Sequence, residues 1–204
     1  MNARPLLVAA AAFLAASCAS PGPAAVVAAG PTPGFTALDL RNAGFEEATR
    51  PGENCAVGWN CAMHNDPHSF RFFHEEGGGT SGARGYCIES VGREPWGRVT
   101  QVLGMERITP LRGAHLRLSV AVKLDGVAAG EAGPLMIAYG GSGQFLRNAT
   151  NLQPMKKGGQ RLETDIDVPE GTFLLDVGVL LQGKGKICID DARLEKAAGS
   201  RGAV

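Results

Sequence analysis

The clearest pattern in this chain is an alternation of aliphatic and polar residues. Residues 114–124 contain aliphatic side chains at every second position, namely Leu116, Leu118, Val120, Val122 and Leu124. The same period recurs in residues 161–168 and 172–181, and the second of these stretches is partly apolar on both faces. Because successive side chains of a β-strand point to opposite faces, the pattern predicts three strands. The last one is expected to be buried on both sides.

Shorter apolar runs predict further strands, and glycine and proline residues separate them. These runs are residues 38–40, 70–74, 86–91, 98–103, 134–139 and 186–194. No stretch of the mature chain shows a convincing apolar face at helical spacing. Many short strands with such punctuation predict an all-β antiparallel β-sandwich, with a closed barrel as the alternative. Two glycines in residues 182–185 predict a hairpin between the last two strands.

The N-terminus has the pattern of an export signal. One positive charge at Arg4 precedes an apolar run, residues 6–16, which is too short to span a bilayer. The run ends in small residues before Cys18, and this resembles a bacterial lipoprotein signal peptide, although Ala15 stands where leucine is preferred. The alternative is an ordinary secretory signal cleaved after Ala16 or Ala19. Both interpretations place the mature chain outside the cytoplasm, and a lipid on Cys18 would tether it to a membrane.

Composition divides the chain into four parts. Residues 1–17 are the predicted signal, 18–36 are an Ala, Pro and Gly-rich tether, 37–196 are one domain, and 197–204 are a disordered tail. The formal net charge is zero, and acidic and basic residues are interspersed. The chain has no basic stripe, so we do not expect it to bind nucleic acid.

Five cysteines are an odd number for an exported chain. If Cys18 carries the lipid, the other four can form two disulfides in an oxidising compartment. Cys55 and Cys61 are close in sequence and are expected to close a loop. The remaining pair, Cys87 and Cys188, would then link two strands that are distant in sequence.

Three sequence segments, taken in order, resemble one fold family. They are Asn42-Ala-Gly-Phe-Glu followed by Gly58-Trp59, then Gly82-Ala-Arg-Gly-Tyr-Cys-Ile followed by Gln101 and Leu116-Arg-Leu-Ser-Val, and finally Gly185-Lys-Ile-Cys-Ile-Asp-Asp-Ala-Arg-Leu. Together they are similar to the galactose-binding-like jelly-roll domains, which include carbohydrate-binding modules of families four, nine and twenty-two. The resemblance implies a jelly roll of two facing sheets. It also implies a structural calcium site that joins the first segment to the last strand.

By this resemblance, the calcium ligands would be Glu46 and Asp190. Calcium prefers several oxygen ligands, and two acids brought together would repel each other without a cation or a base between them. The alternative is that these acids pair with arginines, for which the candidates are Arg41, Arg50 and Arg193. Glu47 and Asp191 are neighbours that would be either solvated or accessory ligands.

Sugar-binding modules stack aromatic rings on pyranose faces and bind hydroxyl groups with polar side chains. Trp96, between Pro95 and Gly97, is expected in an exposed loop, whereas Trp59 is expected in the core. Tyr139 precedes a polar loop that contains Gln144, so this loop is suited to line a cleft. The candidate ligand-binding residues are therefore Trp96, Tyr139 and Gln144. The alternative is that these rings only pack between the sheets.

Patterns typical of catalysis are weak or absent. His64, His68, His74 and Glu75 lie in and beside a loop, without the spacing that fixes a zinc site. Adjacent acids such as Glu75 and Glu76 point to opposite faces of a strand, so such a pair cannot flank one glycosidic bond. We therefore expect a non-catalytic envelope lipoprotein that binds glycan or another envelope ligand. The alternatives are a structural or protein-interaction domain and an uncharacterised glycoside hydrolase.

Overall fold

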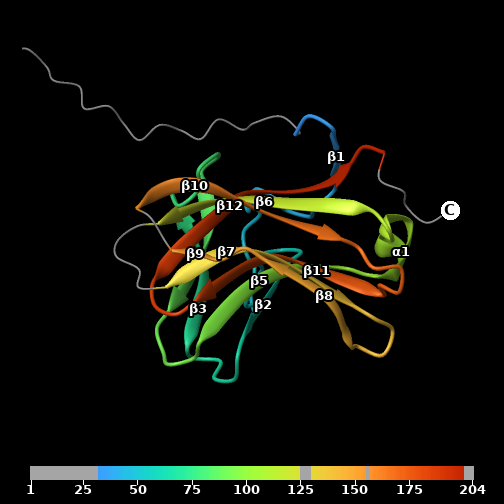
Figure 1. Cartoon of the computed structure of the whole chain (residues 1–204). Helices are drawn as coiled ribbons and strands as arrows, with labels where there is room; N and C mark the ends of the chain where they lie inside the picture. The colour runs from blue at the N-terminus through green and yellow to red at the C-terminus, as the bar shows by residue number, and fades with distance from the viewer. Residues whose placement is uncertain (1–31, 125–129, 155–156, 200–204) are drawn as a thin grey trace, which may run out of the picture.

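Two antiparallel sheets stack face to face in the computed structural model, which describes residues 32–124, 130–154 and 157–199 (Figure 1). Sheet A contains, in spatial order, β10 (Gly158–Asp167), β6 (His115–Leu124), β12 (Lys186–Ala197), β4 (Arg84–Ser90) and β3 (Phe70–Glu76), with β1 (Phe35–Leu38) beside β12. Sheet B contains β2 (Asn60–Met63), β5 (Trp96–Leu103), β11 (Leu174–Gln182), β7 (Glu131–Tyr139) and β8 (Phe145–Thr150), with β9 (Gln153–Pro154) beside β7. The predicted all-β sandwich is confirmed.

The core lies between the sheets and is built from the alternating positions. On β6 the buried aliphatic side chains are those of the predicted face, Leu116, Leu118, Val120, Val122 and Leu124. On β11 the positions facing the core are Leu175, Val177, Val179 and Leu181. These positions fix which face of each strand points outward, because side chains alternate along a strand.

Several strand boundaries differ from the predictions. β1 begins at Phe35, inside the expected tether, and Thr32 already donates two hydrogen bonds to the Glu195 carboxylate, at 2.8 and 2.7 Å. At the other end β12 extends to Ala197, the first residue of the expected tail. The folded domain is therefore longer at both ends than composition indicates. The predicted N-terminal signal, including Cys18, lies outside the described residues.

The predicted C-terminal hairpin is wrong. β11 belongs to sheet B and β12 belongs to sheet A, so the turn at residues 183–185 carries the chain from one layer to the other. The glycines permit the turn, but backbone pairing is made elsewhere: β11 pairs with β5 and β7, whereas β12 pairs with β4, β6 and β1. A short helix, α1 (Met105–Ile108), and a 3-10 turn (Thr109–Leu111) also occur where no helix was predicted.

Two disulfides join the predicted pairs. Cys55 and Cys61 close a short loop, and Cys87 and Cys188 are register partners on β4 and β12. The second bridge links residues 101 positions apart, so it restricts the unfolded chain far more than the first one does.

The first motif segment lies beside the acidic ending of the chain, as expected. Ala192 donates its backbone N–H to the Ala43 carbonyl at 2.9 Å. Phe45 is fully buried, and its ring packs between Trp59 and Tyr86 at centroid distances of 4.8 and 5.7 Å. This stacking holds Phe45 at a φ of 53°, a backbone conformation that a bulky residue rarely adopts.

The described residues contain no helix of the length and apolar character that crossing a membrane requires.

Candidate functional site

The outward face of sheet B carries three aromatic rings. Trp96 is the first residue of β5, not a loop residue as predicted, and Tyr139 is the last residue of β7. Phe145, the first residue of β8, is the register partner of Tyr139, and their ring centroids lie 4.9 Å apart. Trp59, in contrast, is buried in the core, as expected. The structure therefore brings two of the predicted ligand-binding residues onto one face and adds a third ring.

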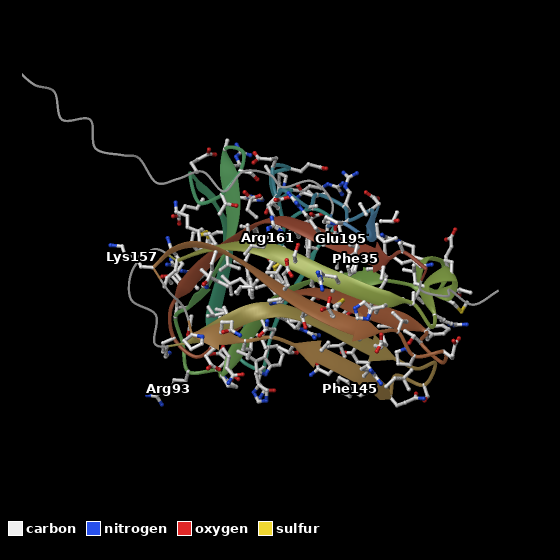
Figure 2. All side chains as sticks on the ribbon, turned by 45° about the horizontal axis from the view of Figure 1, so that its top comes forward. Phe35, Arg93, Phe145, Lys157, Arg161 and Glu195 are labelled. Atoms are coloured by element: carbon white, nitrogen blue, oxygen red, sulfur yellow. A yellow bond between two sulfur atoms is a disulfide. The ribbon has the colours of Figure 1, made fainter. Side chains whose placement is uncertain are left out.

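The rings lie toward opposite ends of this face. Trp96 pairs with Gln182 and Tyr139 pairs with Leu174, at the two ends of β11. A strand rises about 3.3 Å per residue, so these two positions are about 26 Å apart. In Figure 2 the loop residue Arg93, close to Trp96 in sequence, and Phe145 lie toward opposite ends of the sheet. This spacing suits an extended ligand.

A polar group lies between the rings. The Arg98 guanidinium approaches the Asp176 carboxylate at 3.5 Å and lies 5.8 Å from the centre of the Trp96 ring. Asp176 is buried, and burial raises its pKa, although Arg98 and a hydrogen bond from Tyr139 act in the opposite direction. Arg98 Nε is also buried and has no hydrogen-bond partner in the described part of the chain. The Arg98–Asp176 pair was not predicted from the sequence, because the two residues meet only through the register between β5 and β11.

A hollow of about 150 Å³ opens on the same face. Its walls combine apolar side chains from three strands with two polar side chains from β8, and the lining residues are Trp96, Arg98, Leu135, Ile137, Asn148, Thr150 and Leu180. An apolar surface with a few convergent polar groups is typical of a small-molecule or glycan site. Phe145 directly follows Gln144 in the sequence. An aromatic residue beside a predicted ligand-binding residue was the signal from which Phe145 could have been added to the site.

Gln144 does not point along this row of rings. Its side chain lies against Gly140 and accepts a hydrogen bond from the Ser142 hydroxyl, so it closes its own turn. At the opposite end, His64 meets the Trp96 ring edge-on at 6.0 Å and bonds Glu94 through Nδ1 at 2.7 Å. The loops around Trp96 are thereby fixed to one another.

The acids predicted to bind calcium are satisfied by N–H and O–H donors. Asp190 is buried, and its Oδ2 accepts bonds from the backbone N–H groups of Thr80 and Ser81 at 2.8 and 2.7 Å. The Ser81 hydroxyl donates to the same oxygen at 3.0 Å, and Asp191 N donates to Oδ1 at 2.6 Å. Because all of these donors point their hydrogens at the carboxylate, it needs no cation to be stable in this position.

Glu46 holds the next part of the same loop. Its Oε1 accepts bonds from the backbone N–H groups of Ala83 and Arg84, at 3.1 and 3.3 Å. Gly82, at a φ of 72°, lies so close to this oxygen that any side chain would overlap it. A calcium ion on Glu46 Oε1 and Asp190 Oδ2 would face these donor hydrogens. The described arrangement therefore does not fit the predicted calcium site.

The alternative arginine partners are engaged nearby. Arg41 bonds Glu47 at 2.6 Å, Arg50 approaches Glu53 at 3.6 Å, and Arg193 bonds Asp191. Among the residues that the structure describes, the one cluster of potential metal ligands is Glu75, Cys87 and Cys188. Both cysteines of this cluster are in a disulfide, so they cannot act as thiolate ligands.

A larger open hollow, of about 1,080 Å³, lies along the edge of the sandwich between β2 and β3. His74 lines it, and neither ring nitrogen has a hydrogen-bond partner among the described residues. Burial lowers the pKa of His74, with Arg84 contributing in the same direction. The phenylalanine rings that line this hollow all come from β3, whereas the rings on the outward face of sheet B come from three strands and extend along its length. We therefore take the face of sheet B as the better candidate.

Comparison with family models finds no match, and comparison with curated proteins finds none either. Solved structures do match. The CBM22-1 xylan-binding domain of Paenibacillus barcinonensis Xyn10C is 17% identical with a TM-score of 0.54, over 76% of this chain and 92% of that domain. The C-terminal family 22 carbohydrate binding module of Clostridium thermocellum Xyn10B is 16% identical with a TM-score of 0.55, over 77% and 91%. The chain thus forms a β-sandwich of the kind found in carbohydrate-binding modules, as the sequence resemblance implied.

One match is to part of a much larger protein. The enzymatically active domain of tailspike protein 4 from bacteriophage CBA120 is 10% identical with a TM-score of 0.54. The match covers 69% of this chain but only 19% of that chain. At identities of 10–17%, the likeness to these three structures shows the fold of this chain and does not show its activity.

Proposed function

We propose that the outward face of sheet B binds a polysaccharide chain without cleaving it. The observation that carries this proposal is the row formed by Trp96, Tyr139 and Phe145, with the Arg98–Asp176 pair between its ends. Phe145 is exposed, and Trp96 and Tyr139 are half-buried, so each ring leaves surface that can stack on a sugar face. The charged pair and the amide of Asn148 can bond hydroxyl groups. The likeness of the fold to carbohydrate-binding modules supports this proposal.

The test is binding of the full chain to a polysaccharide panel that begins with xylan. Trp96→Ala and Tyr139→Ala are each expected to weaken binding about tenfold, since a stacked ring contributes roughly 0.5–1.5 kcal/mol beyond its buried area. Phe73→Ala is the matched control, because it removes a ring from β3 on sheet A. If neither Trp96→Ala nor Tyr139→Ala weakens binding more than the control, this face is not the site. Binding to none of the polysaccharides would favour a protein-interaction domain.

We also infer that the chain is an envelope lipoprotein anchored through Cys18. The apolar run before Cys18 and the two disulfides, which require an oxidising compartment, support this inference. Cys18→Ala is expected to move the protein from the membrane fraction of bacterial cells to the soluble fraction. A Cys18→Ala protein that stays with the membrane to the same extent as the native chain would contradict anchoring at this cysteine.

A further inference from the structure

Large apolar side chains are exposed at one end of the sandwich. Met105 of α1, Leu146 of β8 and Phe173 before β11 have exposed fractions of 51%, 37% and 40%, and Phe145, the last ring of the proposed glycan face, borders them. We call Met105, Leu146 and Phe173 the apolar end. They come from elements that touch: Phe173 N donates to the Tyr139 carbonyl at 2.7 Å, and α1 lies against the β11 strand. Grouped exposure of this kind marks a surface that is covered in use.

The opposite end of the sandwich is different. Among the described residues, six large hydrophobic side chains are exposed; three of them form the apolar end, and a fourth, Phe145, borders it. Val102 lies on the adjoining part of sheet B. Only Val91, which follows β4 and is 48% exposed, lies at the far end. The uneven distribution indicates that the apolar end has a partner and is not scattered surface apolarity.

The N-terminal chain enters the domain at this same end. Phe35 pairs with Ala197 at the end of β12 and lies 6.3 Å from the ring of His115. His115 in turn bonds Asp167 at 2.8 Å, and Asp167 approaches Arg147 of β8 at 3.8 Å. In Figure 1, α1, the turn between β7 and β8, and β1 all lie toward the right-hand end.

The number of residues between Cys18 and the described domain limits how far the domain can lie from a lipid on Cys18. Residues 19–31 separate Cys18 from Thr32, the first described residue. A chain of this length reaches at most about 45 Å, whatever its conformation. A lipid on Cys18 would therefore hold the apolar end within a few tens of ångströms of the bilayer.

We propose that the apolar end lies on the surface of the membrane that carries the anchor. This inference rests on the proposed anchoring at Cys18, and it adds a second, independent contact with lipid. Apolar side chains at an interface bury themselves at the boundary between headgroups and acyl chains. The charged residues around the apolar end include both Arg107 and Arg147 and both Asp167 and Glu170. Since these charges are mixed, binding is driven by apolar contact and depends little on salt.

The orientation has a consequence for the glycan face. Tyr139 and Phe145 lie at the membrane end of sheet B, and Trp96 lies at the far end. A docked domain therefore holds the row of rings upright on the membrane. The Trp96 end would meet a polysaccharide first.

The first test is quenching of tryptophan fluorescence by lipid. The full chain carrying Phe173→Trp, and a matched chain carrying Val91→Trp, are bound to vesicles of phosphatidylethanolamine and phosphatidylglycerol with and without brominated acyl chains. The added fluorescence of Phe173→Trp is expected to be quenched at least twofold by the brominated lipid, and that of Val91→Trp is not. Equal quenching at the two positions, or none at residue 173, would overturn the proposal.

The second test measures affinity. In the Cys18→Ala background, combining Met105→Ser, Leu146→Ser and Phe173→Ser is expected to weaken vesicle binding at least about tenfold, since each side chain loses the gain of burying its apolar area. Val91→Ser is expected to leave binding unchanged. The leader and tether are the same in every variant, so they cancel from the comparison.

Two results would assign the apolar end to another partner and overturn the proposal. One is a concentration-dependent dimer in vesicle-free solution that the triple variant abolishes. The other is loss of polysaccharide binding in the triple variant, which would make the apolar end part of the glycan site. A failure of the proposed glycan binding can be told apart from a failure of the membrane proposal. In that case the lipid would still quench the fluorescence of residue 173, but no polysaccharide would bind.

Discussion

Asp176 shows at the scale of one residue how a binding face can constrain stability. The carboxyl group is buried on the outward face of sheet B, and it is compensated only in part by Arg98 at 3.5 Å and by a hydrogen bond from Tyr139. Its pKa lies above the usual 3.8, with burial as the main cause. Burial of an ionised group is unfavourable, so this position is kept at a cost to the fold.

The sign of the pH dependence follows from the raised pKa. Just above pH 3.8 the unfolded chain loses the Asp176 proton while the folded protein keeps it. The free energy of unfolding therefore falls as pH rises through the folded-state pKa, and it stays at the lower value above it. Asp176→Asn removes this loss and flattens the profile, which urea unfolding between about pH 4 and pH 7 would measure. A profile for Asp176→Asn as steep as the native one, or flattened equally by Asp39→Asn at an exposed site, would contradict this assignment.

At the scale of elements, the sequence predicts strands that have one buried face. β10 alternates between buried and exposed positions, and β6 carries polar residues between its core positions, so both strands show a two-residue period that can be read directly. β8 was missed because it is exposed on both faces and therefore carries no such period. β2 was missed because it is only four residues long and begins within the Cys55–Cys61 loop.

Some residues of the candidate site likewise have a local sequence signal, and others do not. Trp96 and Tyr139 could be named as candidates because rings beside glycines and polar loops are visible in the sequence. Arg98 and Asp176 were not, because their proximity depends on how β5 and β11 are aligned, which no local pattern encodes. Calcium binding by Glu46 and Asp190 stays a prediction from the family motif, and the N–H donors that these acids accept bonds from could not be read from the sequence.

The loop between β3 and β4 is the element that depends most on those acids. Asp190→Ala would leave the backbone N–H groups of Thr80 and Ser81 without their buried acceptor. The free energy of unfolding is expected to fall by about 1–3 kcal/mol. Thermal unfolding of Asp190→Ala against Glu47→Ala, an exposed acid, would measure it. Adding a chelator to the native protein is expected to leave the melting temperature unchanged, and a clear drop would restore the calcium hypothesis.

At the scale of the whole molecule, the sandwich acts as a rigid frame for one long face. The core and the Cys87–Cys188 bridge fix sheet A, and sheet A supports sheet B from behind (Figure 1). The formal net charge of the chain is zero, so the molecule has no long-range attraction for a charged polymer. Recognition must then depend on contact along the face, and the rings about 26 Å apart set its length.

The affinity for an oligosaccharide is therefore expected to depend on the length of the oligosaccharide. Affinity for oligosaccharides of one linear polysaccharide should rise with each added sugar until the chain reaches both Trp96 and Tyr139, and then level off. Trp96→Ala should move the plateau to shorter chains, because only the half of the face near Tyr139 and Phe145 would still stack. Isothermal titration with a length series, at low and at high salt, would measure this dependence. Since the contacts are stacking and hydrogen bonds, salt should change the affinities little. A monosaccharide that binds as tightly as the longest chain would show that the ligand occupies a single pocket, such as the hollow beside Trp96, and that the extended row is not the binding surface.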